Sequence, residues 1–235
     1  MSAASAKIVS TLDAPAQPGT DDRDRPDAVA SNTLAERVLQ DVLDRIASGA
    51  FQPGSVINEV DLARRLAVSR GPVREAMRRL EGRKLIARSP FTKARVVSLG
   101  PAEIREIFEM REGLEGMATR LACAHMSDDS LRALVGAVES AGQAPNVFDL
   151  HRHIAENCGN RRIRDLLCDE LYYLLRMYRR QSGDSPGRRA EASEEHWQIA
   201  SAMQQRNGPL AESLMRAHIR RATEHLAAID AASSP

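Results

Sequence analysis

Apolar side chains recur every three or four residues along most of this chain, which is the spacing of an amphipathic helix. The first such run consists of Leu34, Val38, Val42 and Ile46. It ends at Gly49, a typical helix stop. The segment 58–67 predicts a second helix, and Pro72 opens a third, because proline costs no hydrogen bond in a first helical turn. Two β-prone stretches, Leu85–Arg88 and Arg95–Leu99, then flank a polar turn. Three helices followed by a hairpin predict a winged helix-turn-helix.

From residue 100 onward the pattern is helical to the end, with breaks at clusters of Gly, Pro, Asn and Ser. The expected helices are 101–125, 128–142, 147–159, 161–181, 187–206 and 209–230. Six helices with short connections predict an antiparallel bundle. Residues 1–30 show no apolar period and are expected to be a disordered tail. The predicted fold is therefore mainly α, with a winged helix-turn-helix over 31–99 and a six-helix domain over 100–231.

Composition narrows the class of protein. Of 235 residues, 43% are hydrophobic and 28% charged, and the sequence contains no apolar run of the roughly 20 residues that span a bilayer. The N-terminal stretch has no signal-peptide core, and the cysteines include no CxxC pair, so we expect a cytoplasmic protein with no membrane partner.

The net charge of +1 hides an asymmetry between the two expected domains. Residues 31–99 carry 13 basic and 7 acidic side chains, whereas residues 100–235 carry 17 and 20. A solvated basic surface would account for this difference, but so would a polyanionic partner that meets only the first domain.

The most specific local pattern lies in the second and third expected helices. A helix-turn-helix places the start of its second helix against the base edges of double-stranded DNA. Here that start is formed by Ser69, Arg70, Gly71 and Arg74. Arg70 and Arg74 are four residues apart and share a face, while Ser69 can cap the helix and contact phosphate. The apolar stripe opposite them is expected to face the core and consists of Val73, Met77 and Leu80.

Histidines form a second candidate site. All six lie after residue 124, and His151, His196 and His218 fall on three different expected helices of the bundle. Each has an apolar neighbour three or four residues away, which places it on a buried face. Buried histidines can be ordinary core residues, but imidazoles from separate helices can also converge on a divalent metal such as zinc.

A three-histidine site leaves one coordination position open. That position could accept a carboxylate oxygen of a metabolite, and Arg111 could clamp the same group, although it could also form an ion pair with Glu115. An open position also fits a metal-dependent hydrolase. Against this, the chain has no HExxH motif, and Glu194 and Glu195 are expected to point away from the face of His196. A constitutive DNA-binding protein with a purely structural bundle is the other alternative.

The stretch SGAFQPGSVINEVDLARRLAVSRGPVREAMRRLE resembles the GntR superfamily of bacterial transcription regulators, and EIREIFEMREGLEGMATRLACAHMS resembles the start of the FadR-type ligand domain called FCD. The resemblance implies a homodimer on operator DNA, with contacts from Ser69, Arg70, Arg74 and the wing. It also implies metal ligands at His151, which precedes a Gly-Asn break, at His196 in an S-x-x-E-H segment, and at His218 in the last helix.

The chain departs from the family pattern at several positions. Val60 replaces a basic residue of some relatives, and Gly71 stands where they often have Thr. The wing turn SPFTKAR lacks the usual glycine, so Lys93 or Arg95 would supply its DNA contacts electrostatically.

The expected metal ligands show a further departure. Metal-binding relatives usually have an Asp four residues before the first histidine, where this chain has Val147. Asp149, two residues before His151, is the candidate fourth ligand in its place, or else water or effector occupies that position. Alternatively the register slips and Asp149 pairs with His153 four residues on, but His151 fits better because of its distance to the Gly-Asn break and its apolar neighbour Ile154.

Together these features predict a transcription regulator, most often a repressor, that binds a palindromic operator and releases it when a small organic acid enters the helical domain. The signal is expected to pass through the first helix of the bundle to the linker Leu99-Gly100-Pro101.

Overall fold

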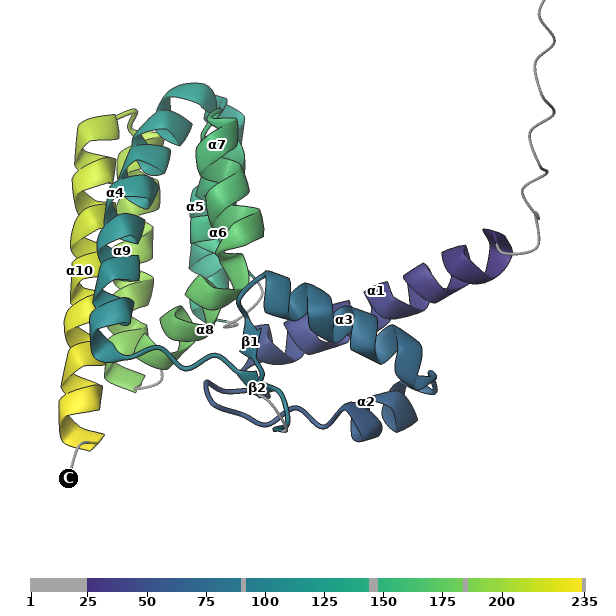
Figure 1. The fold of residues 1–235 in the computed structure, drawn as a ribbon. Coiled ribbons are helices and arrows are strands. Elements are labelled where there is room, and N and C mark those ends of the chain that lie inside the picture. Colours follow the sequence, from purple (N-terminus) through teal and green to yellow (C-terminus); the bar gives the residue numbers. More distant parts are fainter. Residues whose placement is uncertain (1–24, 90–91, 144–147, 184–185, 234–235) are drawn as a thin grey trace, which may run out of the picture.

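The computed structural model describes residues 25–89, 92–143, 148–183 and 186–233, and it is mainly helical (Figure 1). Helix α1 spans Arg25–Ser48, so the last six residues of the predicted tail are helical rather than disordered. Residues 1–24, which make up the rest of that tail, lie outside the described residues. None of the described helices is both long and apolar enough to cross a membrane.

The N-terminal domain is a winged helix-turn-helix. It contains α1, α2 (Glu59–Leu66), α3 (Arg70–Gly82) and a hairpin of β1 (Ile86–Ala87) and β2 (Arg95–Val96). The strands are antiparallel, with Ile86 opposite Val96, and α1 packs against α3. Both strands are shorter than predicted. The other edge of β2 bonds to the loop before α2, since Val96 N–H donates to Ser55 O.

The turn between α2 and α3 sets the direction in which α3 begins. Asn58 caps α2 by accepting from Val60 N–H, and Ala67 ends that helix in the left-handed region with φ 53°. The predicted core stripe of α3 is confirmed, since Val73, Met77 and Leu80 are all buried. Ser69 occupies the N-cap position of α3, but its side chain makes no capping hydrogen bond, contrary to the prediction.

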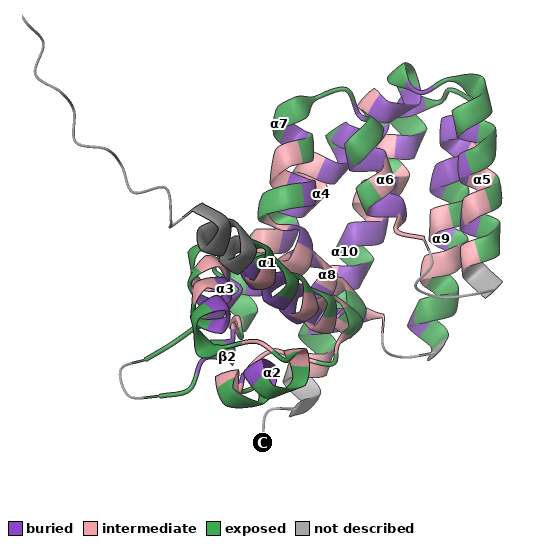
Figure 2. Cartoon of the chain, turned by 90° about the vertical axis from the view of Figure 1, so that its right-hand side faces the viewer, coloured by how far each residue is buried: buried purple, intermediate pink, exposed green. Residues whose placement is uncertain are grey.

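The C-terminal domain is a helical bundle. Its elements are α4 (Pro101–His125), α5 (Asp128–Gln143), α6 (Leu150–Asn157), α7 (Arg161–Arg164), the π-helical segment η1 (Asp165–Glu170), α8 (Tyr172–Ser182), α9 (Pro186–Gln204) and α10 (Gly208–Ser233). Helix α10 packs along α4 and α9, and α5 packs on α9. Buried positions lie on the sides that the helices turn toward one another (Figure 2).

The predicted helix 161–181 is interrupted. Leu171 N–H donates to Leu166 O, five residues back, and this wider turn separates α7 from α8. Apolar spacing could not reveal the interruption, because Ile163, Leu167 and Leu175 still follow one another at multiples of four.

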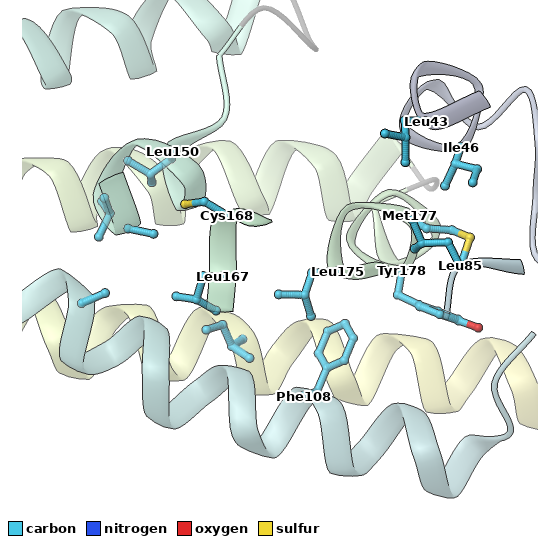
Figure 3. Packing of buried hydrophobic residues seen from close by; sticks show 14 of the residues in the cluster. Leu43, Ile46, Leu85, Phe108, Leu150, Leu167, Cys168, Leu175, Met177 and Tyr178 are labelled. Atoms are coloured by element: carbon cyan, nitrogen blue, oxygen red, sulfur yellow. The ribbon is translucent and has the colours of Figure 1, made fainter. Parts of the chain in front are cut away.

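The two domains share one hydrophobic cluster across α1 and α8. Figure 3 shows Met177 and Tyr178 of α8 close to Leu43 and Ile46 of α1, where the two helices meet. The linker is tied to the same helix, because Leu99 N–H donates to the hydroxyl of Tyr178 at 2.7 Å. Helix α8 therefore contacts the DNA-binding domain directly, a connection that the predicted route through α4 did not include.

Candidate functional site

The predicted DNA-contacting residues form an open surface at the start of α3. Ser69, Arg70, Gly71 and Arg74 are exposed. Among the described residues neither Arg70 nor Arg74 has an ion-pair partner, whereas Arg78 and Arg79 both pair with Glu75. Two unpaired guanidinium groups on one face are available for phosphate or guanine.

Lys93 and Arg95 of the wing are both exposed. The Arg95 guanidinium also donates to the carbonyl of Gly54 at 3.0 Å, which ties the hairpin to the loop before α2. Residues 90–91 of the wing turn lie outside the described residues.

The three predicted histidines converge inside the bundle. His151 of α6, His196 of α9 and His218 of α10 each offer a ring nitrogen, and these atoms all lie within 4.8 Å of one another. The Nε2 atoms of His196 and His218 are 3.4 Å apart. His151 and His218 are buried and His196 is half-buried. Such a cluster of imidazoles could hold a metal ion.

Two buried glutamates contact the Nδ1 atoms of two of the three histidines. Glu115 of α4 lies 2.5 Å from His151 Nδ1, and Glu195 of α9 lies 2.5 Å from His218 Nδ1. A carboxylate on Nδ1 fixes the ring and leaves the Nε2 lone pair for a ligand. The expectation that Glu195 points away from the site is wrong, because it reaches across to α10; Glu194 is exposed.

Burial controls the protonation of the cluster. It lowers the pKa of His151 and His218 to about 4, although Glu115 and Glu195 partly oppose the shift. Burial and the neighbouring His218 lower the pKa of His196 to about 3. Burial alone would raise the pKa of Glu115, but Arg111 and His151 hold it well below its usual range. At neutral pH the imidazoles are therefore uncharged, which is the form that binds metals. The donor set thus fits a metal.

Arg111 is the most buried charged residue of the described chain, with 1% of its surface exposed. Its Nε donates to Glu115 at 2.6 Å, which is the ion pair considered as an alternative to ligand binding. Its Nη2 lies 3.3 Å from His151 Nδ1, while Nη1 is buried without a hydrogen-bond partner among the described residues. One side of the guanidinium is thus structural and the other has an unused donor.

Asp149 lies outside the cluster of imidazole nitrogens. Its carboxylate caps α6 by accepting from Arg152 N–H at 3.2 Å, and it pairs with Arg176 and Arg179 at 3.1 and 3.0 Å. Burial would raise the pKa of Asp149, but Arg179 and His151 lower it far below the usual value. Both oxygens of Asp149 are engaged by these partners. His153 lies outside the histidine cluster, and within the described chain its side chain makes no hydrogen bond or ion pair with Asp149.

The histidines open onto a cavity of about 420 Å³. Besides His151, His196, His218, Arg111 and Asp149, it is lined by Arg176, Arg179, Arg180, Arg188 and Arg189, by Phe148, Leu150, Ser182, Gly183, Ala192 and Ala222, and by Ala47 of α1. Arg176, Arg179, Arg180, Arg188 and Arg189 were not predicted from the sequence. The only signal was their density in RMYRRQSGDSPGRR, which a solvated helix surface explains equally well.

Comparison with known proteins agrees with this architecture. Residues 34–92 match the model of the bacterial regulatory proteins of the gntR family, and residues 106–221 match that of the FCD domain.

Two curated relatives are similar over most of their length. The HTH-type transcriptional regulator YdhC of Bacillus subtilis is 30% identical over 77% of this chain and 85% of its own. A probable D-xylose utilization operon transcriptional repressor of Paenarthrobacter nicotinovorans is 30% identical over 80% and 86%.

Among solved structures, a putative GntR regulator from Rhodococcus sp. RHA1 superposes with a TM-score of 0.72 at 21% identity, over 83% of this chain and 99% of the other. The relatives are transcription regulators rather than enzymes, and some are named repressors. The matched segments coincide with the winged helix and the helical bundle described above, so this chain belongs to the GntR family of DNA-binding transcription regulators, with an FCD domain as its C-terminal part.

Proposed function

We propose that this regulator represses transcription from a palindromic operator as a homodimer, and releases the DNA when a small carboxylate binds at a metal ion in the FCD domain. The observation that carries this proposal is the convergence of three uncharged imidazoles and the unused Nη1 donor of Arg111 on one cavity.

Zinc is the metal that this donor set favours. Zinc sites often use imidazole nitrogens at bonds of about 2.0–2.1 Å, so tetrahedral ligands lie about 3.3 Å from one another. The 3.4 Å between Nε2 of His196 and Nε2 of His218 agrees with that separation. Three protein ligands leave a position for a carboxylate oxygen, which a bound zinc ion would polarise and anchor.

The remaining residues have roles that fit ligand binding better than hydrolysis. A hydrolase needs a general base beside the metal, but Glu115 and Glu195 are engaged on the Nδ1 atoms of His151 and His218. Arg111 Nη1 can instead donate to the second oxygen of a carboxylate whose first oxygen meets the metal.

The direct test combines metal content with DNA binding. Elemental analysis of protein purified without chelator is expected to find close to one divalent ion per chain, and His196→Ala and His218→Ala should lose it. Operator binding, measured by fluorescence anisotropy on a DNA site selected from random sequence, should survive in both variants, while release by carboxylic acids should be lost. Metal-free wild-type protein that still responds normally to such acids would refute the proposal.

A further inference from the structure

The cavity is strongly cationic. Among the described residues, six arginines and one aspartate line it. Four of the six have a carboxylate partner: Arg176 and Arg179 share Asp149, Arg188 donates to Glu195 at 2.8 Å, and Arg111 pairs with Glu115. The side chains of Arg180 and Arg189 have no such partner in the described chain, so the cavity keeps an excess of positive charge.

Arg111, Arg180 and Arg189 have unused side-chain donors. The side chains of Arg180 and Arg189 are exposed and make no hydrogen bond or ion pair with the described residues; only their carbonyls accept, from Gly183 N–H and from the Ser193 hydroxyl. Arg111 pairs with Glu115 through Nε, but its Nη1 is buried without an acceptor in the described chain. A buried guanidinium donor without a partner is costly, and it points to an anionic ligand that supplies the acceptor.

The unused donors lie at two different places. Arg111 is next to His151, deep among the imidazoles. Arg180 lies against Gly49, which directly follows α1: a Cβ built on Gly49 would be 2.4 Å from Arg180 Nε. Ala47 of α1 also lines the cavity. One cationic group, Arg111, therefore lies beside the histidine cluster, and another, Arg180, lies at the boundary with the DNA-binding domain.

We infer that the effector carries two separated anionic groups, and that Arg180 binds the second one at the boundary between the two domains. This rests on the proposed function, in which the first group occupies the metal and Arg111. The second anionic group can be a carboxylate or a phosphate, because Arg180 can donate bidentate hydrogen bonds to either. Because Arg180 packs on Gly49, an anion that draws its guanidinium into the cavity also changes the contact that supports the end of α1.

The test uses pairs of acids in which one member has one anionic group and the other has two. Full-length, zinc-loaded protein is titrated by calorimetry with butyrate and succinate, with valerate and glutarate, and with glycerate and 3-phosphoglycerate. At least one acid with two anionic groups is expected to bind about tenfold tighter than its match with one, which is the gain expected from one charge-assisted bidentate contact. In Arg180→Gln this preference should fall below about twofold while the Kd of the monoanion stays unchanged, and Arg180→Lys should restore part of it.

Arg162→Gln on α7, an exposed arginine outside the cavity, is the matched control and should keep the wild-type preference. Operator release by the preferred acid should weaken in Arg180→Gln in parallel with the calorimetric preference. Equal affinity within every pair, or an Arg180→Gln effect of equal size on both members, overturns the two-anion inference and leaves the proposed function standing. If no acid of either class binds the zinc-loaded protein, the proposed function fails as well.

Discussion

Glu195 Oε2 lies 2.5 Å from Nδ1 of His218, and the same carboxylate accepts from Arg188 and Arg221. His218 and Arg188 share Oε2 while Arg221 donates to Oε1, so both oxygens of the carboxylate are held in place. The imidazole of His218 is therefore held with its Nε2 toward His196 and the cavity, as it would have to be to bind a metal.

Glu195→Gln should weaken zinc binding by roughly tenfold to a hundredfold, because an amide is a weaker acceptor from Nδ1–H and no longer raises the basicity of the ring. Competition with a chromogenic chelator measures the change. Glu194→Gln, one residue earlier and exposed, is the control and should bind zinc like the wild type. Equal zinc affinities of the two variants would contradict the supporting role of Glu195.

Mild acidification should lower the free energy of unfolding of the metal-free protein. The pKa of His151 and His218 is lowered to about 4 and that of His196 to about 3, chiefly by burial. In the unfolded chain these imidazoles bind protons near pH 6.5. Between about pH 6.5 and 4 the unfolded state thus binds more protons, so the free energy of unfolding should fall as the pH falls.

Urea unfolding of metal-free protein at pH 7.5, 6 and 5 measures this slope. His196→Leu removes one of the three groups without breaking a pair with a carboxylate, and it should flatten the slope. A free energy of unfolding that stays constant from pH 7.5 to 5 in the wild type would show that the histidines titrate normally.

Arg70→Ala and Arg74→Ala should each cost roughly 1–3 kcal/mol of operator affinity where the side chain reads a base, or reduce the salt slope by about one where it contacts phosphate. The fold should be unaffected, because both side chains are exposed and unpaired among the described residues. Anisotropy titrations at several salt concentrations separate the two cases. Arg162→Ala is the control, and wild-type binding by both Arg70→Ala and Arg74→Ala would exclude α3 as the recognition helix.

The FCD domain should dimerise without the winged helix. Recognition helices on a palindrome must sit about 34 Å apart, which one copy cannot achieve. Light scattering of full-length protein and of residues 100–235 should report a dimer in both cases. If the full-length protein is a dimer but residues 100–235 are a monomer, the dimer interface lies in the winged helix instead.

Tyr178→Phe should lower the free energy of unfolding by about 0.5–1.5 kcal/mol, because Leu99 N–H loses its hydroxyl acceptor. Urea denaturation measures the loss. Tyr173→Phe, on the same helix with a half-buried ring, is the matched comparison. If the two variants are equally stable, the bond between linker and α8 contributes nothing measurable.

The sequence predicted the elements of the winged helix and the buried face of each histidine because both depend on local spacing. Val73, Met77 and Leu80 repeat with the helix, and each of His151, His196 and His218 has an apolar neighbour that fixes its face. Helix periodicity determines which side of a helix is buried, whereas the meeting of the three imidazoles was expected from the resemblance to the FCD domain.

What the sequence did not predict depends on contacts between distant segments. Glu195 was expected to turn away from His196, but its partner is His218, 23 positions further along the chain. Asp149 was considered as a ligand because it is near His151 in sequence, and its ion pairs with Arg176 and Arg179 of α8 were not predicted. Spacing along one helix carries no information about which side chain of another helix supplies the opposite charge.

Helix α8 turns Met177 and Tyr178 toward α1 and the linker and places Arg176, Arg179 and Arg180 in the cavity. In a genetic screen these two faces would yield two classes of allele within the eleven codons of one helix. If the protein represses as proposed, lesions on the arginine face would abolish release because the effector no longer binds. Lesions at Met177 or Tyr178 would leave the effector bound but would break its connection to the winged helix.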